Sequence, residues 1–560
     1  MVKDIKPDRR GLFSAIDALS EWKVAGFLIL AVTSIYLSLS SMDRVPDIME
    51  ARNLVAAREC VQDGNCLRTT INGQPRVRKP PLPTWAAALA MSRSGDANSV
   101  FAARLPSVVI VSLMSLFTYL LARHWLDKSS SLAASFVMVT SRIMMDVGRR
   151  ATWDIFSYSF AVGGLWALFR ALRREEPIVL SVVGSGILWG LSFLSKGPVT
   201  LYSVLLPFLL ALFVMERRRE FRWRVVPLIL LLAIPLGASW WGYLYVVYPE
   251  TLSILSSEVE AWQSRHIKEF YFYLFSFFGL IFPWIAPFIG ASLLPFAKEK
   301  EGEPLISDEH KKRIVFFLVW LGITLLLLSI IPEKKERYTL PVLLPTSLAV
   351  AVFFERVQIS GISELPRSLR VLWSIHLFQV LLLTFVGAIG IAYFTWTGEP
   401  ISLLLFIPLL LATGFMVWKR RHSAGSVVMS SVLTIVILAV MAGWVFSNSS
   451  GGIRKFDFEG ASRVATITAG RKLYTLTLNE KVTWGIRRTH EVIDRNTIVD
   501  SFPALVLVDE GDLGSFRQSL KSREISFEEL HRFRFGKWHI LYELNDEKSR
   551  ALSLSKKDGS

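Results

Sequence analysis

Apolar runs and short polar connections alternate along most of this chain. The hydrocarbon core of a bilayer is about 30 Å thick and needs about 20 helical residues to cross it. The runs lie at residues 24–41, 103–122, 130–146, 154–171, 178–195, 198–215, 225–247, 271–295, 314–331, 339–354, 371–394, 401–418 and 426–446. The pattern predicts a polytopic α-helical membrane protein with about thirteen transmembrane helices.

Basic residues gather in alternate connections between these runs. With the N-terminus in the cytoplasm, one alternation of orientation puts all of these clusters on the cytoplasmic side, as the positive-inside rule predicts. An odd number of spans then leaves the loop after the first run and the C-terminal tail outside, so we expect the working face to be the outer one. The basic clusters are Arg123 with His124, Arg173 with Arg174, the group from Arg217 to Arg224, Lys311 to Arg313, and Lys419 to Arg421.

Changes in composition divide the chain into three predicted parts. Residues 1–23 are an amphipathic lead-in that we expect to stay in the cytoplasm. Residues 24–446 form the transmembrane domain, which includes an outer catalytic loop at 42–102. Residues 447–560 contain short β-rich runs and one stretch with helical spacing, which predict a small α/β domain on the periplasmic side.

Composition excludes a water-soluble protein and argues against a nucleic-acid partner. Of the 560 residues 52% are hydrophobic and only 20% are charged, and the mean hydropathy is +0.41. The formal net charge of +16 would suit nucleic acid in a soluble protein. Because most Lys and Arg residues flank apolar runs, we interpret them as anchors to membrane lipids and expect no nucleic-acid binding.

The outer loop begins with carboxylates in a segment of helix-forming residues. Asp47 and Glu50 would share one face of such a helix, and Arg52 follows closely. One interpretation is an amphipathic helix on the membrane surface, capped by Asp47. The other is a general base that deprotonates an acceptor hydroxyl while nearby cations take a departing phosphate. Spacing alone leaves both open.

A basic segment follows in the same loop, with prolines directly after its cations. Pro80 and Pro81 restrict the backbone and keep the preceding Lys79 in an extended segment. Lysine binds phosphate as a point charge and arginine binds it with two hydrogen bonds. The segment is therefore a candidate phosphate site, and an ordinary interfacial anchor beside Trp85 is the alternative.

Further charges lie in connections predicted on the outer side, against the positive-inside tendency. Asp154 opens an apolar run and has Arg150 four residues earlier as a potential ion-pair partner. The three cations and the phenol within 334–338 are suited to clamping a phosphate or pyrophosphate, although lipid head groups also explain the charges. The candidate site residues in these connections are Arg150, Asp154, Lys196, Arg265, Lys334, Lys335, Arg337 and Tyr338.

Cys60 and Cys66 are the only cysteines, and both lie in the predicted outer loop. On an oxidising face such a close pair is expected to form a disulfide. Two free thiols are the alternative, and a metal site lacks two further ligands.

Taken together, these motifs resemble those of the polytopic lipid-linked glycosyltransferases of the GT-C fold. The branch concerned holds the lipid A aminoarabinose transferases and the bacterial relatives of protein O-mannosyltransferases, and the resemblance covers roughly residues 24–350. Its pieces are Glu50-Ala-Arg52 (family Asp-Glu-x-Arg-Tyr), Lys79-Pro-Pro-Leu-Pro-Thr-Trp85 (family Glu-Lys-Pro-Pro-Leu), Arg150 to Asp154, Gly190-Leu-Ser-Phe-Leu-Ser-Lys196-Gly-Pro198 (family Gly-Leu-Ala-Phe-Leu-Thr-Lys-Gly-Pro), Phe282-Pro-Trp284, and Lys334-Lys-Glu-Arg-Tyr338-Thr-Leu-Pro341 (family Lys-Arg-x-x-Tyr-Leu-Leu-Pro).

The resemblance implies a sugar donor linked to polyprenyl phosphate and an inverting transfer at the outer face of the bacterial inner membrane. The acceptor would be lipid A, a protein or another envelope glycan. Some relatives use a divalent metal, for which this sequence offers no clear ligand set. Met49 stands at the family's first acid, so the choice between Glu50 and Asp47 as base stays open. Asn53 stands at the family's Tyr, so contacts with the donor are expected to differ.

The implied roles complete the prediction of a glycosyltransferase. Arg52, Lys79, Arg265 and the cluster from Lys334 to Tyr338 would hold the lipid phosphate. The alternative is a transporter or flippase of lipid-linked sugars. It would require paired broken helices with ionisable residues at mid-membrane, whereas nearly all charges here lie at the ends of apolar runs.

Overall fold

In the computed structural model the chain forms two compact units. The first is helical, and the second contains both helices and strands. The first unit comprises Met1–Met42, Val77–Pro83 and Arg104–Gly443, and the second comprises Asp43–Arg76, Thr84–Ala103 and Trp444–Ser560. The residues that the structure describes are 12–42, 47–173, 178–215, 221–251, 269–299, 304–397, 404–448, 456–494 and 502–545.

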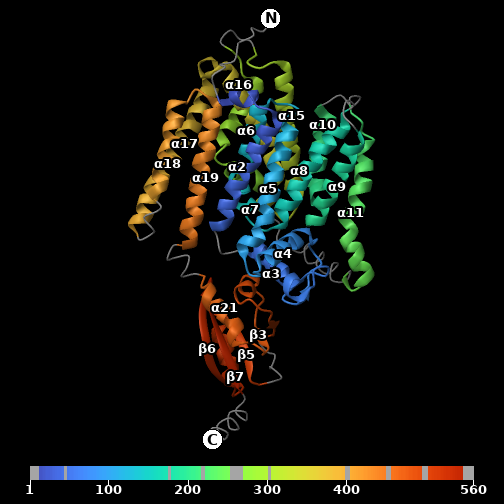
Figure 1. The fold of residues 1–560 in the computed structure, drawn as a ribbon, viewed down its shortest axis with the longest axis vertical. Helices are drawn as coiled ribbons and strands as arrows, with labels where there is room; N and C mark the ends of the chain where they lie inside the picture. The colour runs from blue at the N-terminus through green and yellow to red at the C-terminus, as the bar shows by residue number, and fades with distance from the viewer. Residues whose placement is uncertain are drawn as a thin grey trace, which may run out of the picture. The chain divides into compact units, whose positions relative to one another are not determined.

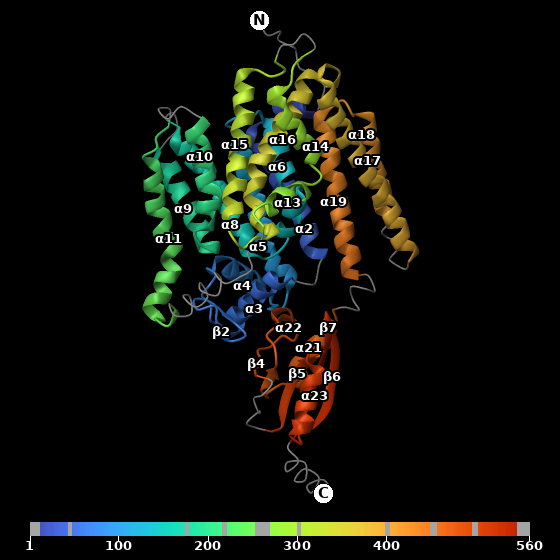
Figure 2. The ribbon, with the colours of Figure 1, turned by 180° about the vertical axis from the view of Figure 1, so that it is seen from behind.

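Long helices of the first unit run side by side as a bundle (Figure 1 and Figure 2). Two further helices, α4 (Leu82–Ser94) and α5 (Val100–Ala122), have residues in both units. The elements of the first unit are α1 (Leu12–Ala18), α2 (Glu21–Met42), α6 (Lys128–Thr140), α7 (Arg142–Gly148), α8 (Trp153–Leu172), α9 (Ile178–Lys196), η1 (Leu201–Leu205), α10 (Leu206–Met215), α11 (Val225–Val247), α13 (Phe272–Ile281), α14 (Ile285–Leu293), η3 (Leu294–Phe296), α15 (Asp308–Ile330), η4 (Glu336–Thr339), α16 (Leu340–Ser360), η5 (Ile362–Glu364), α17 (Arg367–Trp396) and α18 (Phe406–Lys419), with most of α19 (Ala424–Asn448).

Within the described residues, nine helices are long and apolar enough to cross a membrane. The pair α13 and α14 is bent by 112° and forms a tenth crossing if it is one span. Leu201–Met215 and α18 are apolar but shorter. All of these elements coincide with predicted apolar runs, which confirms the class of polytopic helical membrane protein.

The prediction of one continuous helix over 130–146 is wrong. The backbone leaves the helical conformation at Ser141, where ψ is 141°, and separates α6 from α7. The 13 residues of α6 rise only about 20 Å at 1.5 Å per residue. The break was not predicted because Thr140, Ser141 and Arg142 interrupt the apolar run only briefly, and buried apolar side chains lie on either side of these three residues.

Glycines let α8, α9 and α11 pack closely. A Cβ atom added at Gly190 of α9 would lie 2.6 Å from Leu236 of α11, and one at Gly237 of α11 would lie 2.3 Å from Phe193 of α9. Gly164 of α8 faces the Trp189 ring in the same way, at 2.7 Å. Small residues at helix contacts are typical of membrane bundles, and they hold the ends of α8 and α9 at a fixed separation.

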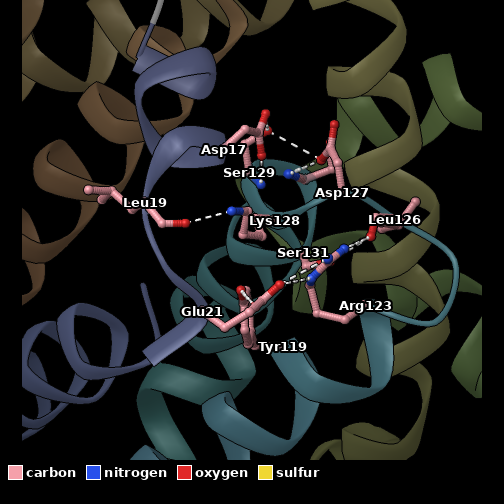
Figure 3. Close-up of polar contacts among 11 residues, drawn as sticks. Asp17, Leu19, Glu21, Tyr119, Arg123, Leu126, Asp127, Lys128, Ser129 and Ser131 are labelled. Atoms are coloured by element: carbon pink, nitrogen blue, oxygen red, sulfur yellow. Dashed lines mark hydrogen bonds and ion pairs between the residues drawn. The ribbon is translucent and has the colours of Figure 1, made fainter. Parts of the chain in front are cut away.

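Polar contacts fasten the N-terminal helices to α5 and α6 (Figure 3). The Asp17 carboxylate accepts hydrogen bonds from the backbone N–H and the hydroxyl of Ser129, at 2.8 and 3.0 Å. Glu21 accepts from the Tyr119 hydroxyl at 2.5 Å and forms an ion pair with Arg123 at 3.0 Å. Burial raises the pKa of Asp17, which lies outside the spans.

The second unit contains a five-stranded sheet in the order β4-β3-β5-β7-β6. β3 is parallel to β4 and β5, whereas β7 is antiparallel to β5 and β6. This confirms the predicted small C-terminal domain of strands and helices. Its elements are α21 (Phe458–Ile467), β3 (Leu473–Thr475), α22 (Glu480–Gly485), β4 (Glu491–Val492), β5 (Ala504–Asp509), α23 (Leu513–Ser522), β6 (Ser526–Phe535) and β7 (Lys537–Asn545).

Each face of this sheet has its own apolar core, because successive side chains of a strand point to opposite faces. Leu505 and Leu507 of β5 pack with Val464 of α21 on one face. Val506 and Val508 pack on the other face with residues of α23. The same unit holds three elements of the loop region, α3 (Ile48–Asp63), β1 (Thr70–Ile71) and β2 (Gln74–Pro75).

Candidate functional site

A cavity of about 550 Å³ lies in the helical unit and gathers charged side chains that are far apart in the sequence. Its walls come from the segment 77–83, the ends of α8 and α9, the π-helix η1 and the approach to α16. The lining residues are Arg78, Lys79, Asp154, Ser157, Tyr158, Lys196, Val199, Thr200, Tyr202, Ser203, Leu328, Ile331, Glu333, Arg337, Tyr338, Leu340 and Pro341. Five of the predicted site residues, Lys79, Asp154, Lys196, Arg337 and Tyr338, therefore lie around one cavity.

Local backbone features place these side chains. The chain turns sharply after α9 at Gly197, where φ is +87°, a conformation that favours glycine. Lys196 is the last residue of α9 and is held at this turn. The Trp241 indole N–H donates to the Val77 carbonyl at 3.2 Å, which attaches the start of the Lys79 segment to α11.

Asp154 is the buried acid of the cavity, with 4% of its side chain exposed. It forms an ion pair with Lys196, and the Arg337 Nε atom lies 3.7 Å from its second oxygen. A buried carboxylate needs such partners, because desolvation of an unpaired charge is costly. The group of Asp154, Lys196 and Arg337 therefore has a net positive charge.

Asp154 pairs with Lys196 and not with Arg150, which the sequence offered only as a potential partner. Arg150 instead pairs with Asp146 of α7 at 2.6 Å. The spacing of four residues favours a pair only within one helix. Here α8 begins at Trp153 and Thr152 is extended, so Arg150 and Asp154 lie on different elements.

Tyr338 collects cations over its ring. The Lys196 Nζ atom lies 4.9 Å from the ring centre, the Arg337 guanidinium 5.4 Å and the Lys335 Nζ atom 5.9 Å. Cation–π contacts of this kind attract the charges to the ring face. The phenol therefore holds the cationic groups beside Asp154 in place.

Lys334 and Lys335 are not among the lining residues of the cavity. Lys334 is buried, with 2% exposed, and donates to the Ile331 carbonyl at 2.8 Å. Burial lowers the pKa of this amine. Lys335 forms an ion pair with Glu333. Both lysines thus have partners in the chain, and a direct contact of either with phosphate stays a prediction.

Apolar side chains, among them Val199, Leu328 and Ile331, line much of the rest of the cavity. A space with apolar walls and a group of cations suits an amphiphile that has an anionic head group and a hydrocarbon chain. The apolar walls match the hydrocarbon chain of such a ligand, and the cations match its anionic head group.

The predicted base candidates lie in the second unit, on α3. The Asp47 carboxylate caps this helix and accepts from the backbone N–H of Glu50 at 2.7 Å. Glu50 is fully buried. Arg52 forms an ion pair with Glu480 at the start of α22, at 2.6 Å, and its side chain is 36% exposed. Arg52 therefore contacts the C-terminal sheet domain, which was not predicted from the sequence.

Cys60 and Cys66 are joined by a disulfide bond within the same unit. The bridge links the last turn of α3 to the start of the following loop. The Trp85 indole N–H donates to the Cys66 carbonyl at 2.7 Å, so the bridged loop also contacts α4.

Sequence reasoning missed Arg58, which connects α3 to α22. It is 1% exposed and donates to the carbonyls of Thr483 and Trp484, at 2.9 and 3.1 Å. Its guanidinium lies 5.2 Å from the Trp484 ring centre. Burial lowers the pKa of Arg58 to about 10, so it remains charged at neutral pH. No local signal in the sequence distinguishes it from a surface arginine.

A second missed group surrounds Glu59, whose carboxylate accepts from the backbone N–H groups of Asn72 and Gly73 at 2.6 and 3.2 Å. Asn72 also exchanges two hydrogen bonds with the backbone of His490, at 2.6 and 2.7 Å. Asn-Gly is the preferred dipeptide of a tight hairpin turn, so the hairpin of β1 and β2 was predictable from this signal.

Two expectations lack support in the described part of the chain. Arg265 lies outside the described residues. Among those that are described, no group of three or more His, Cys, Asp or Glu side chains is placed to hold a metal ion. The described residues do not fit a metal site, and no step below uses one.

The chain is similar to known proteins in sequence and in fold. A family model described as dolichyl-phosphate-mannose-protein mannosyltransferase matches residues 78–243, which include Lys79, Asp154 and Lys196. The undecaprenyl phosphate-alpha-4-amino-4-deoxy-L-arabinose arabinosyl transferase of Pseudomonas aeruginosa strain UCBPP-PA14 is 25% identical over 469 residues, or 80% of each chain. The enzyme of the same name from Photorhabdus laumondii is 23% identical over 348 residues, or 59% of each chain.

Solved structures identify the fold. ArnT from Cupriavidus metallidurans in the apo state has a TM-score of 0.72 at 14% identity, covering 93% of this chain and 98% of that one. The same protein bound to undecaprenyl phosphate has a TM-score of 0.70 at 15% identity, with the same coverage. This protein is therefore a polytopic membrane protein with the GT-C fold of lipid-linked glycosyltransferases. Within that class its fold is of the aminoarabinose transferase type.

Proposed function

We propose that the protein is a glycosyltransferase that moves a sugar from a polyprenyl-phosphate-linked donor to an acceptor. The observation that carries the proposal is the apolar cavity in which Lys79, Lys196 and Arg337 gather around one buried acid. A lipid phosphate presents the complementary chemistry, an anionic head on a hydrocarbon chain. The transferase names of the relatives favour transfer over the alternative of a transporter or flippase.

In this proposal the cations of the cavity stabilise the leaving group. When the bond between the sugar and the phosphate breaks, negative charge grows on the phosphate oxygens. Lys79 and Arg337 line the cavity and supply positive charge to these oxygens. Asp154 and Tyr338 hold Lys196 and Arg337 in place and keep them from turning away.

The acceptor hydroxyl must lose a proton as it attacks the anomeric carbon, and inversion follows from a single displacement. Glu50 and Asp47 remain our candidates for the base. Asp47 already caps α3 through a hydrogen bond to the Glu50 N–H, so its loss would also weaken that helix. We therefore favour Glu50. The acceptor is lipid A, a protein or another envelope glycan.

We further propose that the reaction takes place on the periplasmic face of the bacterial inner membrane. Multiple helices of membrane-spanning length support the membrane location. The one-sided basic clusters of the sequence support the orientation.

The proposal is tested with Lys79→Ala. Loss of one partner from a desolvated charge pair costs about 2–5 kcal/mol, whereas loss of an exposed contact costs under about 1 kcal/mol. We expect transfer to fall by more than about thirtyfold. Mass spectrometry of envelope lipids and glycoproteins, from cells with wild-type or variant protein, provides the readout.

Arg93→Ala is the matched control, because Arg93 is an exposed cation of α4 that does not line the cavity. It should transfer at the wild-type rate. Glu50→Gln and Asp47→Asn are compared in the same assay, and loss of a base should lower transfer about 10²–10⁴-fold. Unchanged envelope products in cells that lack the protein altogether would refute the proposed function.

A further inference from the structure

Hydroxyl groups line the cavity beside its charged side chains, and their hydrogen bonds indicate which part of a ligand they can bind. Four of the six described lining residues that carry a hydroxyl donate its hydrogen within the protein. A hydroxyl has one hydrogen to donate and two lone pairs that accept. The direction of its hydrogen bond inside the protein therefore decides whether it presents a donor or an acceptor to the cavity.

Ser192 fixes this direction for two of the four. It is fully buried in α9, and its hydroxyl donates to the Ser157 carbonyl at 2.8 Å, which uses its only hydrogen. The Ser192 oxygen also lies 2.7 Å from the Thr200 Oγ1 atom and 3.2 Å from the Ser157 Oγ atom. The hydrogens in these two contacts must then come from Thr200 and Ser157. Both hydroxyls are left with acceptor lone pairs.

The other two hydroxyls also donate to backbone carbonyls. Tyr202 donates to the Leu327 carbonyl at 2.8 Å, and Ser203 donates to the Val199 carbonyl at 3.0 Å. All four hydroxyls therefore present acceptors to the cavity. This hydroxyl wall consists of Ser157, Thr200, Tyr202 and Ser203.

The hydroxyl wall lies one helical turn from the ion pair of the cavity. Ser157 is three residues after Asp154 in α8, and Ser192 is four residues before Lys196 in α9. Residues three or four apart share a face of a helix, about 5 Å apart along its axis. The cavity therefore has two chemically different parts, with cations at the helix ends and acceptors one turn further into the helices.

The two parts suit different parts of a lipid-linked sugar, so this inference rests on the proposed function. Phosphate oxygens accept hydrogen bonds, which matches the cations and not a wall of acceptors. Sugar hydroxyls and a protonated amine can donate. We propose that the hydroxyl wall binds the donor's sugar by accepting its hydrogen bonds, and that Ser192 is the positioning residue that sets this polarity. The substrate class is a sugar whose hydroxyl or amino groups are free, without acetyl or methyl groups, on the side that meets the wall.

The test compares phosphodiester lipids of equal charge on the purified protein in nanodiscs. Native mass spectrometry measures binding of undecaprenyl methyl phosphate, which has no sugar, and of undecaprenyl phosphate linked to glucose, to mannose or to 4-amino-4-deoxy-L-arabinose. We expect at least one sugar lipid to bind about fivefold or more tightly than the methyl phosphodiester, the value of a net hydrogen bond.

Fluorinated analogues of the tightest-binding sugar lipid test the polarity of the wall. Each hydroxyl or amino group of the sugar is replaced in turn by fluorine, which cannot donate a hydrogen bond. At least one replacement should weaken binding about fivefold, because it leaves buried acceptors of the wall unpaired.

Variants assign these effects to single residues. Thr200→Val and Ser157→Ala should each weaken binding of the sugar lipid about fivefold and leave that of the methyl phosphodiester unchanged. Thr200→Ser keeps the hydroxyl and should bind like the wild type. Ser192→Ala releases two hydrogens into the wall, so the penalty for fluorine should fall below about twofold. Ser185→Ala is the matched control, because this buried serine of α9 donates to the Gly164 carbonyl of α8 at 3.0 Å and does not line the cavity.

Three outcomes would overturn the inference. The first is a set of sugar lipids that bind no more tightly than the methyl phosphodiester. The second is a set of fluorinated analogues that all bind like their parent. The third is an equal loss of both kinds of lipid in the Thr200→Val and Ser157→Ala variants, which would mean that these hydroxyls only maintain the fold. If none of the lipid phosphates binds, the proposed function itself fails.

Discussion

At the scale of single residues, the ion pair of Asp154 and Lys196 is the central charge interaction in the cavity wall. Asp154 is at the start of α8 and Lys196 at the end of α9, so the pair also joins two helices. Breaking a buried pair costs more than the pair contributes, because the remaining charge stays desolvated. Removing either member of the pair should therefore lower both the stability of the protein and its activity.

We expect Asp154→Asn and Lys196→Met each to lower the free energy of unfolding by about 3–5 kcal/mol. The double variant should lose clearly less than the two single losses together, with a coupling of about 1 kcal/mol or more. Thermal unfolding in detergent measures this cycle. The exposed pair Glu459 and Arg463 of α21 is the control, with an expected coupling below about 0.5 kcal/mol. Additive losses at Asp154 and Lys196 would show that the two charges act separately.

Arg150 and Lys196 show what could and could not be predicted about single residues from the sequence. Lys79, Lys196, Arg337 and Tyr338 were identified from charged clusters at predicted outer edges, and the structure places them around one cavity. Arg150 was considered as a partner of Asp154 because of its spacing within one helix, but α8 begins only after Arg150. Lys196 is 42 residues away along the chain. Only the packing of α8 on α9 decides that contact.

At the scale of elements, the helices were predictable and their breaks were not. Long apolar runs form helices in a membrane because every backbone group must be hydrogen-bonded internally. That rule says nothing about the turn at Ser141 or about the 112° bend between α13 and α14, both of which interrupt predicted apolar runs. The contacts of α3 with α22 could not be predicted from the sequence either, because Arg58 and Trp484 are 426 residues apart along the chain.

Arg58 provides a prediction for these elements. Arg58→Met keeps an apolar side chain of similar length but removes hydrogen bonds to two carbonyls at the end of α22. We expect a loss of about 2 kcal/mol, the value of hydrogen bonds to a charged group. Hydrogen exchange should become faster in both α3 and α22. Arg463→Met, at an exposed position, should leave exchange unchanged. Wild-type protection of α22 in the Arg58 variant would mean that the contact does not stabilise it.

At the scale of the whole molecule, the second unit constrains the topology. The loop segments 43–76 and 84–103 belong to one compact unit with the C-terminal tail, so loop and tail must lie on the same side of the membrane. The number of crossings between them is then even. The twelve predicted runs between 103 and 446 give an even number only when the run at 130–146 crosses the membrane in spite of its break at Ser141. The disulfide of Cys60 and Cys66 further favours the oxidising side.

The topology prediction follows from these two constraints. A reporter that is active only outside the cytoplasm should be active when fused after Ser447 and inactive when inserted within 300–310, a segment that precedes the basic cluster at 311–313. The physical reason is that Lys and Arg near the ends of spans are retained in the cytoplasm. Thiol labelling of the denatured, unreduced protein adds an independent readout, because bridged cysteines do not react. A cytoplasmic reporter after Ser447, together with full labelling of Cys60 and Cys66, would place both polar segments inside and reverse the proposed orientation of the reaction.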